Sequence, residues 1–216
     1  MKKHSIAIKI FMLFVATVCS FALIVQLVLM LNNVPERSPT YTNAIVSYFS
    51  FFTILSNVLV AKSLGWSLLF PSTKIGMFCA RPTVRSAVAV YIFIVGVIYN
   101  IVLKSIWNPQ GWQLVADRIL HDVVPVTYVI CWYFMVPAKS LQWNSFLWWL
   151  IFPLCYLIYS LVRGMFTGWF PYPFLDVTKE GWNKVLLNSF AIAVSFCVVS
   201  ILFTGVNKYF KSKTAA

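Results

Sequence analysis

The chain has 216 residues, of which 61% are hydrophobic and only 10% are charged, and its mean hydropathy is +0.83. A water-soluble domain carries about a quarter of its residues as charged side chains, so this composition excludes that class. The formal net charge is +12. Because the basic residues flank apolar stretches, we assign this excess to contact with an anionic membrane face rather than to nucleic-acid binding.

Six apolar stretches follow one another along the chain, each close to or above the roughly 20 residues that span a bilayer as a helix. They lie at residues 6–31, 44–70, 86–107, 114–136, 144–167 and 185–206. The connections between them are short and rich in turn residues, and none is long enough to form a domain of its own. The sequence therefore predicts an all-α fold, a bundle of six transmembrane helices in a single domain covering residues 1–216.

The first stretch follows Lys2 and Lys3, as a signal peptide would, but it continues to Leu31 without a small-residue cleavage site. We therefore interpret it as an uncleaved first span. If the N-terminus is cytoplasmic, that side receives the basic residues Lys2, Lys3, Lys9, Lys62, Lys74, Arg81, Arg85, Lys139, Lys208, Lys211 and Lys213. The other side receives Arg37, Lys104, Arg118, Arg163, Lys179 and Lys184. This asymmetry follows the positive-inside rule and predicts that both termini are cytoplasmic.

The second stretch carries Ser50, Thr53 and Asn57 at positions i, i+3 and i+7, which lie on one face of a continuous helix. Thr53 lies nine residues from Ala44, or about 13 Å along a helix. A threonine in a membrane helix usually donates its hydroxyl hydrogen to its own backbone, so Thr53 alone is weak evidence for catalysis.

The fourth stretch contains Asp117-Arg118-Ile119-Leu120-His121-Asp122, in a chain with only five acids and two histidines. Ionisable groups are costly at bilayer depth and persist mainly where they pair or function. Asp117 and His121 are an i, i+4 pair, and a carboxylate beside an imidazole fixes its tautomer. We interpret Arg118 and Asp122 as a structural ion pair. Pro125 cannot donate to the His121 carbonyl and is expected to bend the helix there.

Polar residues within the predicted spans gather in the outward half. They are Gln26, Ser50, Thr53, Asn100, Lys104, Asp117, Arg118, His121, Asp122, Arg163 and Asn188. Such groups cannot face lipid tails without a partner, so we expect a polar cavity on the outer side of the bundle. His121 lies seven residues from Leu114, or about 10 Å, so its depth matches that of Thr53 and the two can share this cavity.

Other chemistries have little support in the sequence. The five cysteines are scattered without a CxxC spacing, and the chain contains no GxSxG, HExxH, P-loop or GxGxxG motif. A metal site built from Asp117, His121 and Asp122 is disfavoured, because Asp122 points about 100° away from His121 on a helix. We therefore predict neither a metal nor a cofactor.

Two segments resemble the signatures of a bacterial six-span membrane family: Tyr48-Phe49-Ser50-Phe51-Phe52-Thr53-Ile54-Leu55-Ser56-Asn57 and Leu120-His121-Asp122-Val123-Val124-Pro125. That family is distantly similar to the androgen-induced-gene and ADTRP-type membrane proteins. Those relatives are threonine hydrolases that cleave fatty acid esters of hydroxy fatty acids. The resemblance implies a Thr53 nucleophile and a His121 base, acting on membrane lipids or fatty acid esters in the cytoplasmic membrane of a bacterium.

Under this interpretation, position suggests roles for further residues. Asp117 orients His121, and either Asn57 or Asn100 donates to the oxyanion. Arg163 holds a fatty-acid carboxylate, Ser50 lies on the substrate side, and the apolar bundle accommodates the acyl chain.

Two rival interpretations stay open. The first is a small-molecule or proton-coupled transporter that uses Asp117, His121 and Asp122 as a relay. The absence of matching halves in the sequence weakens it. The second is a non-catalytic membrane assembly subunit. The sequence fixes neither the true substrate nor the oligomeric state.

Overall fold

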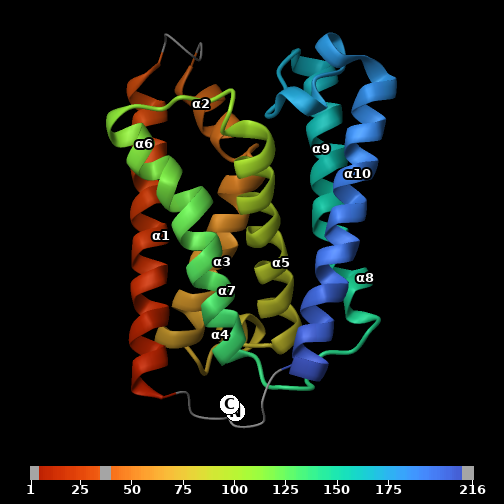
Figure 1. The fold of residues 1–216 in the computed structure, drawn as a ribbon. Coiled ribbons are helices and arrows are strands. Elements are labelled where there is room, and N and C mark those ends of the chain that lie inside the picture. The colour runs from red at the N-terminus through yellow and green to blue at the C-terminus, as the bar shows by residue number, and fades with distance from the viewer. Residues whose placement is uncertain (1–4, 35–39, 211–216) are drawn as a thin grey trace.

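A computed structural model describes residues 5–34 and 40–210, and this part of the chain is helical (82% helix) and contains no strand. The long helices run roughly along one common axis (Figure 1). In chain order they are α1 (Ile6–Asn32), α2 (Tyr41–Tyr48), α3 (Phe52–Leu69), α4 (Lys74–Cys79), α5 (Pro82–Ile98), η1 (Tyr99–Leu103), α6 (Gly111–Arg118), η2 (Ile119–Val123), α7 (Val124–Met135), α8 (Ser145–Trp149), α9 (Ile151–Thr167), η3 (Pro173–Leu175), α10 (Val177–Gly205) and η4 (Val206–Phe210). The basic residues Lys2, Lys3, Arg37, Lys211 and Lys213 lie outside the described ranges.

Within the described ranges, five helices are long and apolar enough to cross a membrane. They are Ile6–Asn32, Phe52–Leu69, Pro82–Leu103, Ser145–Thr167 and Val177–Tyr209. Large apolar side chains cover their outer faces, and Phe166 on α9 is 88% exposed. Such surfaces need lipid around them, so the predicted all-α membrane fold is confirmed at this level. The remaining predicted span, 114–136, corresponds to α6, η2 and α7, which follow one another without a gap.

The second predicted span is not one helix. Residues 49–51 separate α2 from α3, and Phe51 has an extended backbone (φ −85°, ψ 127°). The Ser50 carbonyl accepts a hydrogen bond from the Tyr156 hydroxyl at 2.9 Å. The prediction that Ser50 and Thr53 share one helical face was therefore wrong, because contacts with α9 replace the helical ladder at this point.

Two other boundaries also differ from the sequence prediction. The last helix begins at Val177 rather than near residue 185, but Gly181 interrupts it with a non-helical backbone (φ 74°, ψ 156°). The third span begins at Pro82, a residue that suits the first turn of a helix because it lacks an N–H.

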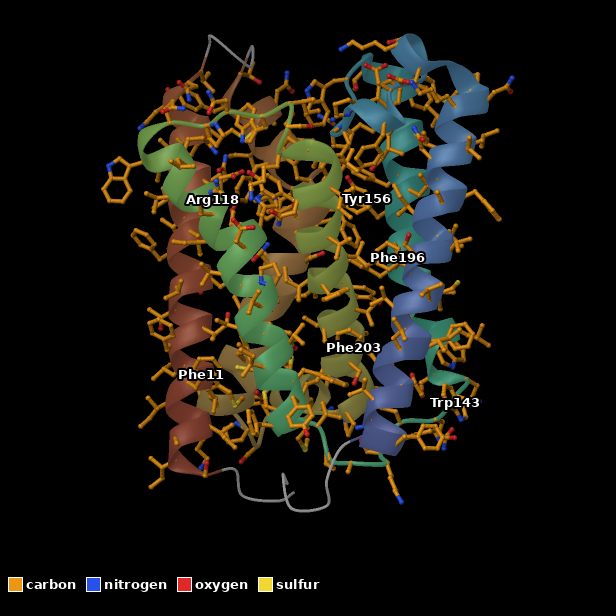
Figure 2. The ribbon with its side chains drawn as sticks, viewed as in Figure 1. Phe11, Arg118, Trp143, Tyr156, Phe196 and Phe203 are labelled. Atoms are coloured by element: carbon orange, nitrogen blue, oxygen red, sulfur yellow. The ribbon has the colours of Figure 1, made fainter. Side chains whose placement is uncertain are left out.

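The α9–α10 pair lies on the opposite side of α5 from α1, α6 and α7 (Figure 1). An aromatic cluster joins this pair to α3 and α5; its members are Phe52, Tyr91, Phe152, Tyr156 and Phe196. Tyr156 and Phe196 are labelled in Figure 2. The centroids of Phe52 and Tyr156 are 5.0 Å apart in an edge-to-face arrangement, which is favourable for aromatic pairs.

Two helices near the centre of the molecule change to a π-helical register. The Lys104 N–H donates to the Tyr99 carbonyl at 2.9 Å, and the Val124 N–H donates to the Ile119 carbonyl. In the second of these turns, the residue that should donate its backbone N–H to the Leu120 carbonyl is Pro125. Proline has no N–H, so this carbonyl lacks its regular donor. Single π turns of this kind are frequent at functional sites.

Asn57 on α3 satisfies the carbonyl that Pro125 leaves without a donor. Its Nδ2 donates to the Leu120 carbonyl at 3.3 Å and to the Thr53 carbonyl at 2.9 Å. A regular α-helix would instead have left the His121 carbonyl without its donor. The π turn thus moves the freed carbonyl back by one residue and ties η2 to α3.

Gly96 allows α5 to approach η2 and α7 closely. A Cβ added at this glycine would lie 3.0 Å from the Pro125 Cβ and 3.2 Å from the His121 carbonyl oxygen. Both distances are shorter than ordinary van der Waals contact, so only glycine fits here without movement of a neighbour. The close approach positions His121 beside α5.

Candidate functional site

Thr53 is the second residue of α3 and is only 7% exposed. Many other hydroxyls of the bundle donate to the carbonyl four residues earlier in their own helix, as in Ser20, Ser86, Thr127, Ser195 and Thr204. Thr53 Oγ1 instead lies 3.3 Å from His121 Nε2 and 3.3 Å from the Tyr172 hydroxyl. The predicted approach of Thr53 to His121 is therefore confirmed, and the break before α3 leaves this hydroxyl facing other elements.

The surroundings of His121 assign its tautomer. Its Nδ1 lies 2.9 Å from the Asp117 backbone oxygen and 3.3 Å from Asp117 Oδ1. Both neighbours are acceptors, so Nδ1 carries the hydrogen and donates it. Nε2 then presents its lone pair to Thr53 Oγ1, and the threonine hydroxyl donates to it. The hydroxyl, the imidazole and the carboxylate are thus aligned in the order of the corresponding groups in a catalytic triad.

Tyr99 holds this arrangement from the α5 side. Its ring stacks on the His121 imidazole with centroids 4.0 Å apart and an interplanar angle of 16°. Its hydroxyl donates to Asp117 Oδ2, and the Asp117 side chain is only 4% exposed. The carboxylate therefore has partners on both of its oxygens, and the imidazole ring is fixed in plane.

Tyr172 belongs to the site, although no motif in the sequence marked it as a functional residue. It lies in the connection between α9 and α10, and its hydroxyl accepts a hydrogen bond from the Thr53 N–H at 3.2 Å. The N-cap residue of α3, Phe51, has no side-chain group that caps the helix, so the Tyr172 hydroxyl accepts from the N-terminal N–H instead. Tyr172 stacks on Phe174, with rings 5.1 Å apart and 4° from parallel. Only the flanking prolines Pro171 and Pro173 suggested an ordered connection here.

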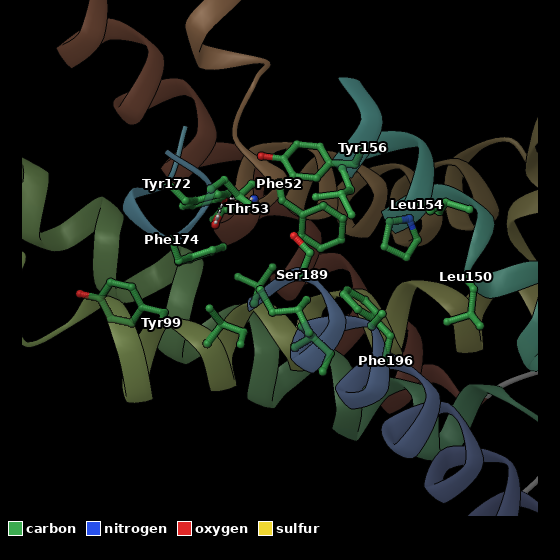
Figure 3. Close-up of a pocket in the computed structure, with 18 of the residues that line it drawn as sticks. Phe52, Thr53, Tyr99, Leu150, Leu154, Tyr156, Tyr172, Phe174, Ser189 and Phe196 are labelled. Atoms are coloured by element: carbon green, nitrogen blue, oxygen red, sulfur yellow. Dashed lines mark hydrogen bonds between the residues drawn. The ribbon is translucent and has the colours of Figure 1, made fainter. Parts of the chain in front are cut away.

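A cavity of about 270 Å³ opens beside Thr53 between α5, α9 and α10 (Figure 3). Its lining includes the hydroxyl-bearing residues Thr53, Tyr99, Tyr156, Tyr172 and Ser189, and most of the remaining lining is apolar. Leu154 of α9 and Phe196 of α10 are among these apolar residues. A mainly apolar cavity with a few convergent polar groups is the usual form of a small-molecule site.

The two predicted oxyanion donors are already engaged elsewhere. Asn57 is fully buried, and its Nδ2 donates to the carbonyls of Thr53 and Leu120. Asn100 donates from Nδ2 to the Gly96 carbonyl and to Asp122 Oδ1. An amide group has two N–H donors, so neither side chain has one left for an oxyanion. Both residues position helices instead.

The other two predicted substrate contacts lie outside this cavity. The Ser50 hydroxyl donates to the Val46 carbonyl at 2.7 Å and contacts the Tyr159 hydroxyl. Arg163 donates to Ser47 Oγ at 3.1 Å, and its guanidinium lies over the Trp169 ring, 4.4 Å from the centroid. These contacts place Ser50 and Arg163 in the packing between α2 and α9.

Asp122 is separated from the triad. It pairs with Arg118 at 2.9 Å, which confirms the predicted i, i+4 ion pair. Among the described residues, no group of three or more His, Cys, Asp or Glu side chains is arranged to hold a metal ion. Asp117 and His121 contact one another, whereas the Asp122 carboxylate accepts hydrogen bonds from Asn100 and Arg118.

Comparisons of the chain with protein-family models, with curated proteins and with solved structures each find no match.

Proposed function

We propose that this protein is an intramembrane lipid esterase with a threonine nucleophile. The observation that carries the proposal is the row formed by Thr53 Oγ1, His121 Nε2 and the Asp117 carboxylate, beside an apolar cavity. The resemblance of the segments around Thr53 and His121 to the bacterial six-span family and its threonine-hydrolase relatives supports the same assignment. The substrates are then fatty acid esters, with esters of hydroxy fatty acids as the class that the resemblance suggests.

In the first half of the reaction, His121 Nε2 takes the hydroxyl proton of Thr53, and Oγ1 attacks the ester carbonyl carbon. The bond from that carbon to the alcohol oxygen breaks, and the imidazolium gives its proton to the leaving alkoxide. Thr53 carries the acyl group at this stage. Asp117 stabilises the transient imidazolium, since its carboxylate lies beside Nδ1.

When Oγ1 attacks, the ester carbonyl oxygen becomes negatively charged and needs a hydrogen-bond donor. In this proposal the Tyr172 hydroxyl is that donor. This hydroxyl lies 3.3 Å from Thr53 Oγ1, directly beside the proposed nucleophile. Thr53 also stands in the first turn of α3, where the helix dipole favours negative charge. Tyr172 thus replaces Asn57 and Asn100 as the oxyanion donor.

In the second half, a water molecule attacks the acyl-threonine while His121 Nε2 takes its proton. The tetrahedral intermediate collapses, the fatty acid leaves, and Thr53 Oγ1 regains the proton from His121. The protein returns to its starting state.

The proposal includes six spans with both termini in the cytoplasm of a bacterial cell. Helices α6, η2 and α7 together extend over residues 111–135, or about 37 Å at the rise of an α-helix, which is enough to cross the hydrocarbon core. The excess of basic residues on the side of the termini supports the orientation.

Purified protein in detergent, assayed with a long-chain fatty ester, tests the proposal. We expect Thr53→Ala and His121→Ala each to abolish turnover, and the double variant to be no worse than either, because the two side chains act as one unit. Labelling with a fluorophosphonate, followed by mass spectrometry, should place the modification on Thr53.

Thr127→Ala is the matched control, since the Thr127 hydroxyl donates to its own helix at the Val123 carbonyl. It should keep wild-type turnover. A wild-type protein inert toward all lipid esters, or a Thr53→Ala variant that retains activity, would overturn the proposal. In vesicles, loss of pH-dependent solute uptake in His121 variants would favour the transporter interpretation instead.

A further inference from the structure

Ser189 of α10 carries a buried hydroxyl that has no hydrogen-bond partner among the described residues. The residue is only 8% exposed and belongs to the wall of the cavity beside Thr53. On the same helix, Ser195 and Thr204 donate to the carbonyl four residues earlier. Ser189 makes no such bond, and Figure 3 shows its side chain pointing from α10 into the space that Thr53 also faces. Burial of an unpaired hydroxyl is unfavourable, so a polar atom of the molecule that occupies the cavity is its natural partner.

The other hydroxyls in the wall of this cavity are already engaged. Tyr99 and Tyr156 each donate to an acceptor of the protein. The hydroxyls of Thr53 and Tyr172 lie 3.3 Å apart and have roles in the proposed reaction. Among the described lining residues, Ser189 is the remaining hydroxyl, and its hydrogen is committed to no protein acceptor.

The turn of α10 that carries Ser189 is held against the connection that carries Tyr172. Asn188, the preceding residue, donates to the Phe174 carbonyl at 3.1 Å. Phe174 in turn stacks on the Tyr172 ring, with centroids 5.1 Å apart. The Tyr172 hydroxyl lies beside Thr53 Oγ1. Ser189 and Tyr172 therefore face one cavity from two segments that are bonded to each other.

Building on the proposed esterase activity, we propose that Ser189 is a second donor to the oxyanion, together with Tyr172. While Thr53 Oγ1 forms its bond to the ester carbonyl carbon, both hydroxyls donate to the carbonyl oxygen, which takes up the negative charge. When the bond from this carbon to the alcohol oxygen breaks, the carbonyl re-forms and both hydroxyls keep their protons. Oxyanion sites are built from more than one donor, because the charge develops where water is excluded.

A structural role and a catalytic role of Ser189 predict different effects on stability. A serine kept for folding would have a partner in the protein, and its replacement by alanine would lower the Tm. Ser189→Ala removes a hydroxyl that has no such partner, so the variant should be as stable as the wild type or more stable. A loss of activity without a loss of stability thus indicates contact with the substrate.

Kinetics of Ser189→Ala in detergent, with a long-chain fatty ester, test the assignment. We expect kcat to fall by about 100-fold, the usual loss for one oxyanion donor. KM should stay near the wild-type value, because the bond strengthens only as the charge develops. Ser200→Ala is the matched control: Ser200 is a fully buried serine of α10 whose hydroxyl also lacks a partner among the described residues, but it does not line this cavity. It should keep the wild-type kcat.

A fluorophosphonate adduct on Thr53 gives a second, direct measurement. The phosphonyl oxygen of such an adduct takes the position of the oxyanion. In the structure of the adduct, Ser189 Oγ should lie about 2.7–3.1 Å from that oxygen. The rate of labelling should also fall in Ser189→Ala, in parallel with kcat, and stay at the wild-type value in Ser200→Ala.

The outcomes separate this inference from the esterase proposal. A wild-type kcat in Ser189→Ala, a change confined to KM, an equal loss in Ser200→Ala, or an adduct in which Ser189 Oγ does not reach the phosphonyl oxygen would each overturn the role of Ser189. The esterase would stand in all four cases, because Thr53→Ala would still abolish turnover. If the wild type hydrolyses no lipid ester, the esterase proposal itself fails and the role of Ser189 falls with it.

Discussion

Replacement of Asn57 by leucine tests whether the contact between α3 and the π turn holds His121 in place. Asn57→Leu keeps the side-chain volume but removes the hydrogen bond from Nδ2 to the Leu120 carbonyl, which Pro125 cannot replace. The Thr53 carbonyl loses the same donor but can still accept from its own helix. One buried carbonyl is thus left without a partner, at a cost of about 1–2 kcal/mol in a membrane interior.

For a chain of this size, such a loss corresponds to a fall in Tm of about 2–8 °C, measurable by thermal unfolding in detergent. Turnover of the ester should fall as well, because Leu120 directly precedes His121. Ser56→Ala is the control, since the buried Ser56 hydroxyl has no hydrogen-bond partner among the described residues. The free energy of unfolding of the Ser56→Ala variant should change by less than about 0.5 kcal/mol. An Asn57→Leu variant with wild-type Tm and turnover would refute the reasoning.

Two further predictions concern the triad and the topology. Asp117→Asn keeps a partner for Tyr99 but removes the charge beside Nδ1, so kcat should fall by about 100-fold, less than in Thr53→Ala; a wild-type kcat would contradict the assigned role. Reporter fusions after Lys139 should signal cytoplasm, and those after Pro109 and Asp176 the outside; a fusion at Lys139 reporting the outside would exclude the proposed order of spans.

Features that depend on neighbouring residues in the chain could be predicted from the sequence. Transfer into a bilayer depends on the summed hydropathy of one segment, so composition alone identified a helical membrane protein. The pairs Asp117–His121 and Arg118–Asp122 followed from the spacing of residues on one helix. The approach of Thr53 to His121 could also be predicted, because the two residues lie at similar depths in their predicted spans and the polar residues gather in the outward half.

Features that depend on contacts between distant segments required the tertiary structure. The break before α3 arises where Ser50 bonds to residues of α9, and the π turn is completed by an amide from α3. Tyr172 reaches Thr53 from 119 residues further along the chain, and no local pattern encodes that contact. Hydropathy is a property of a segment, whereas the partner of a buried polar group depends on which helices pack together. The sequence therefore determined that polar groups gather in this bundle, and packing alone decided which of them meet and which cavities they face.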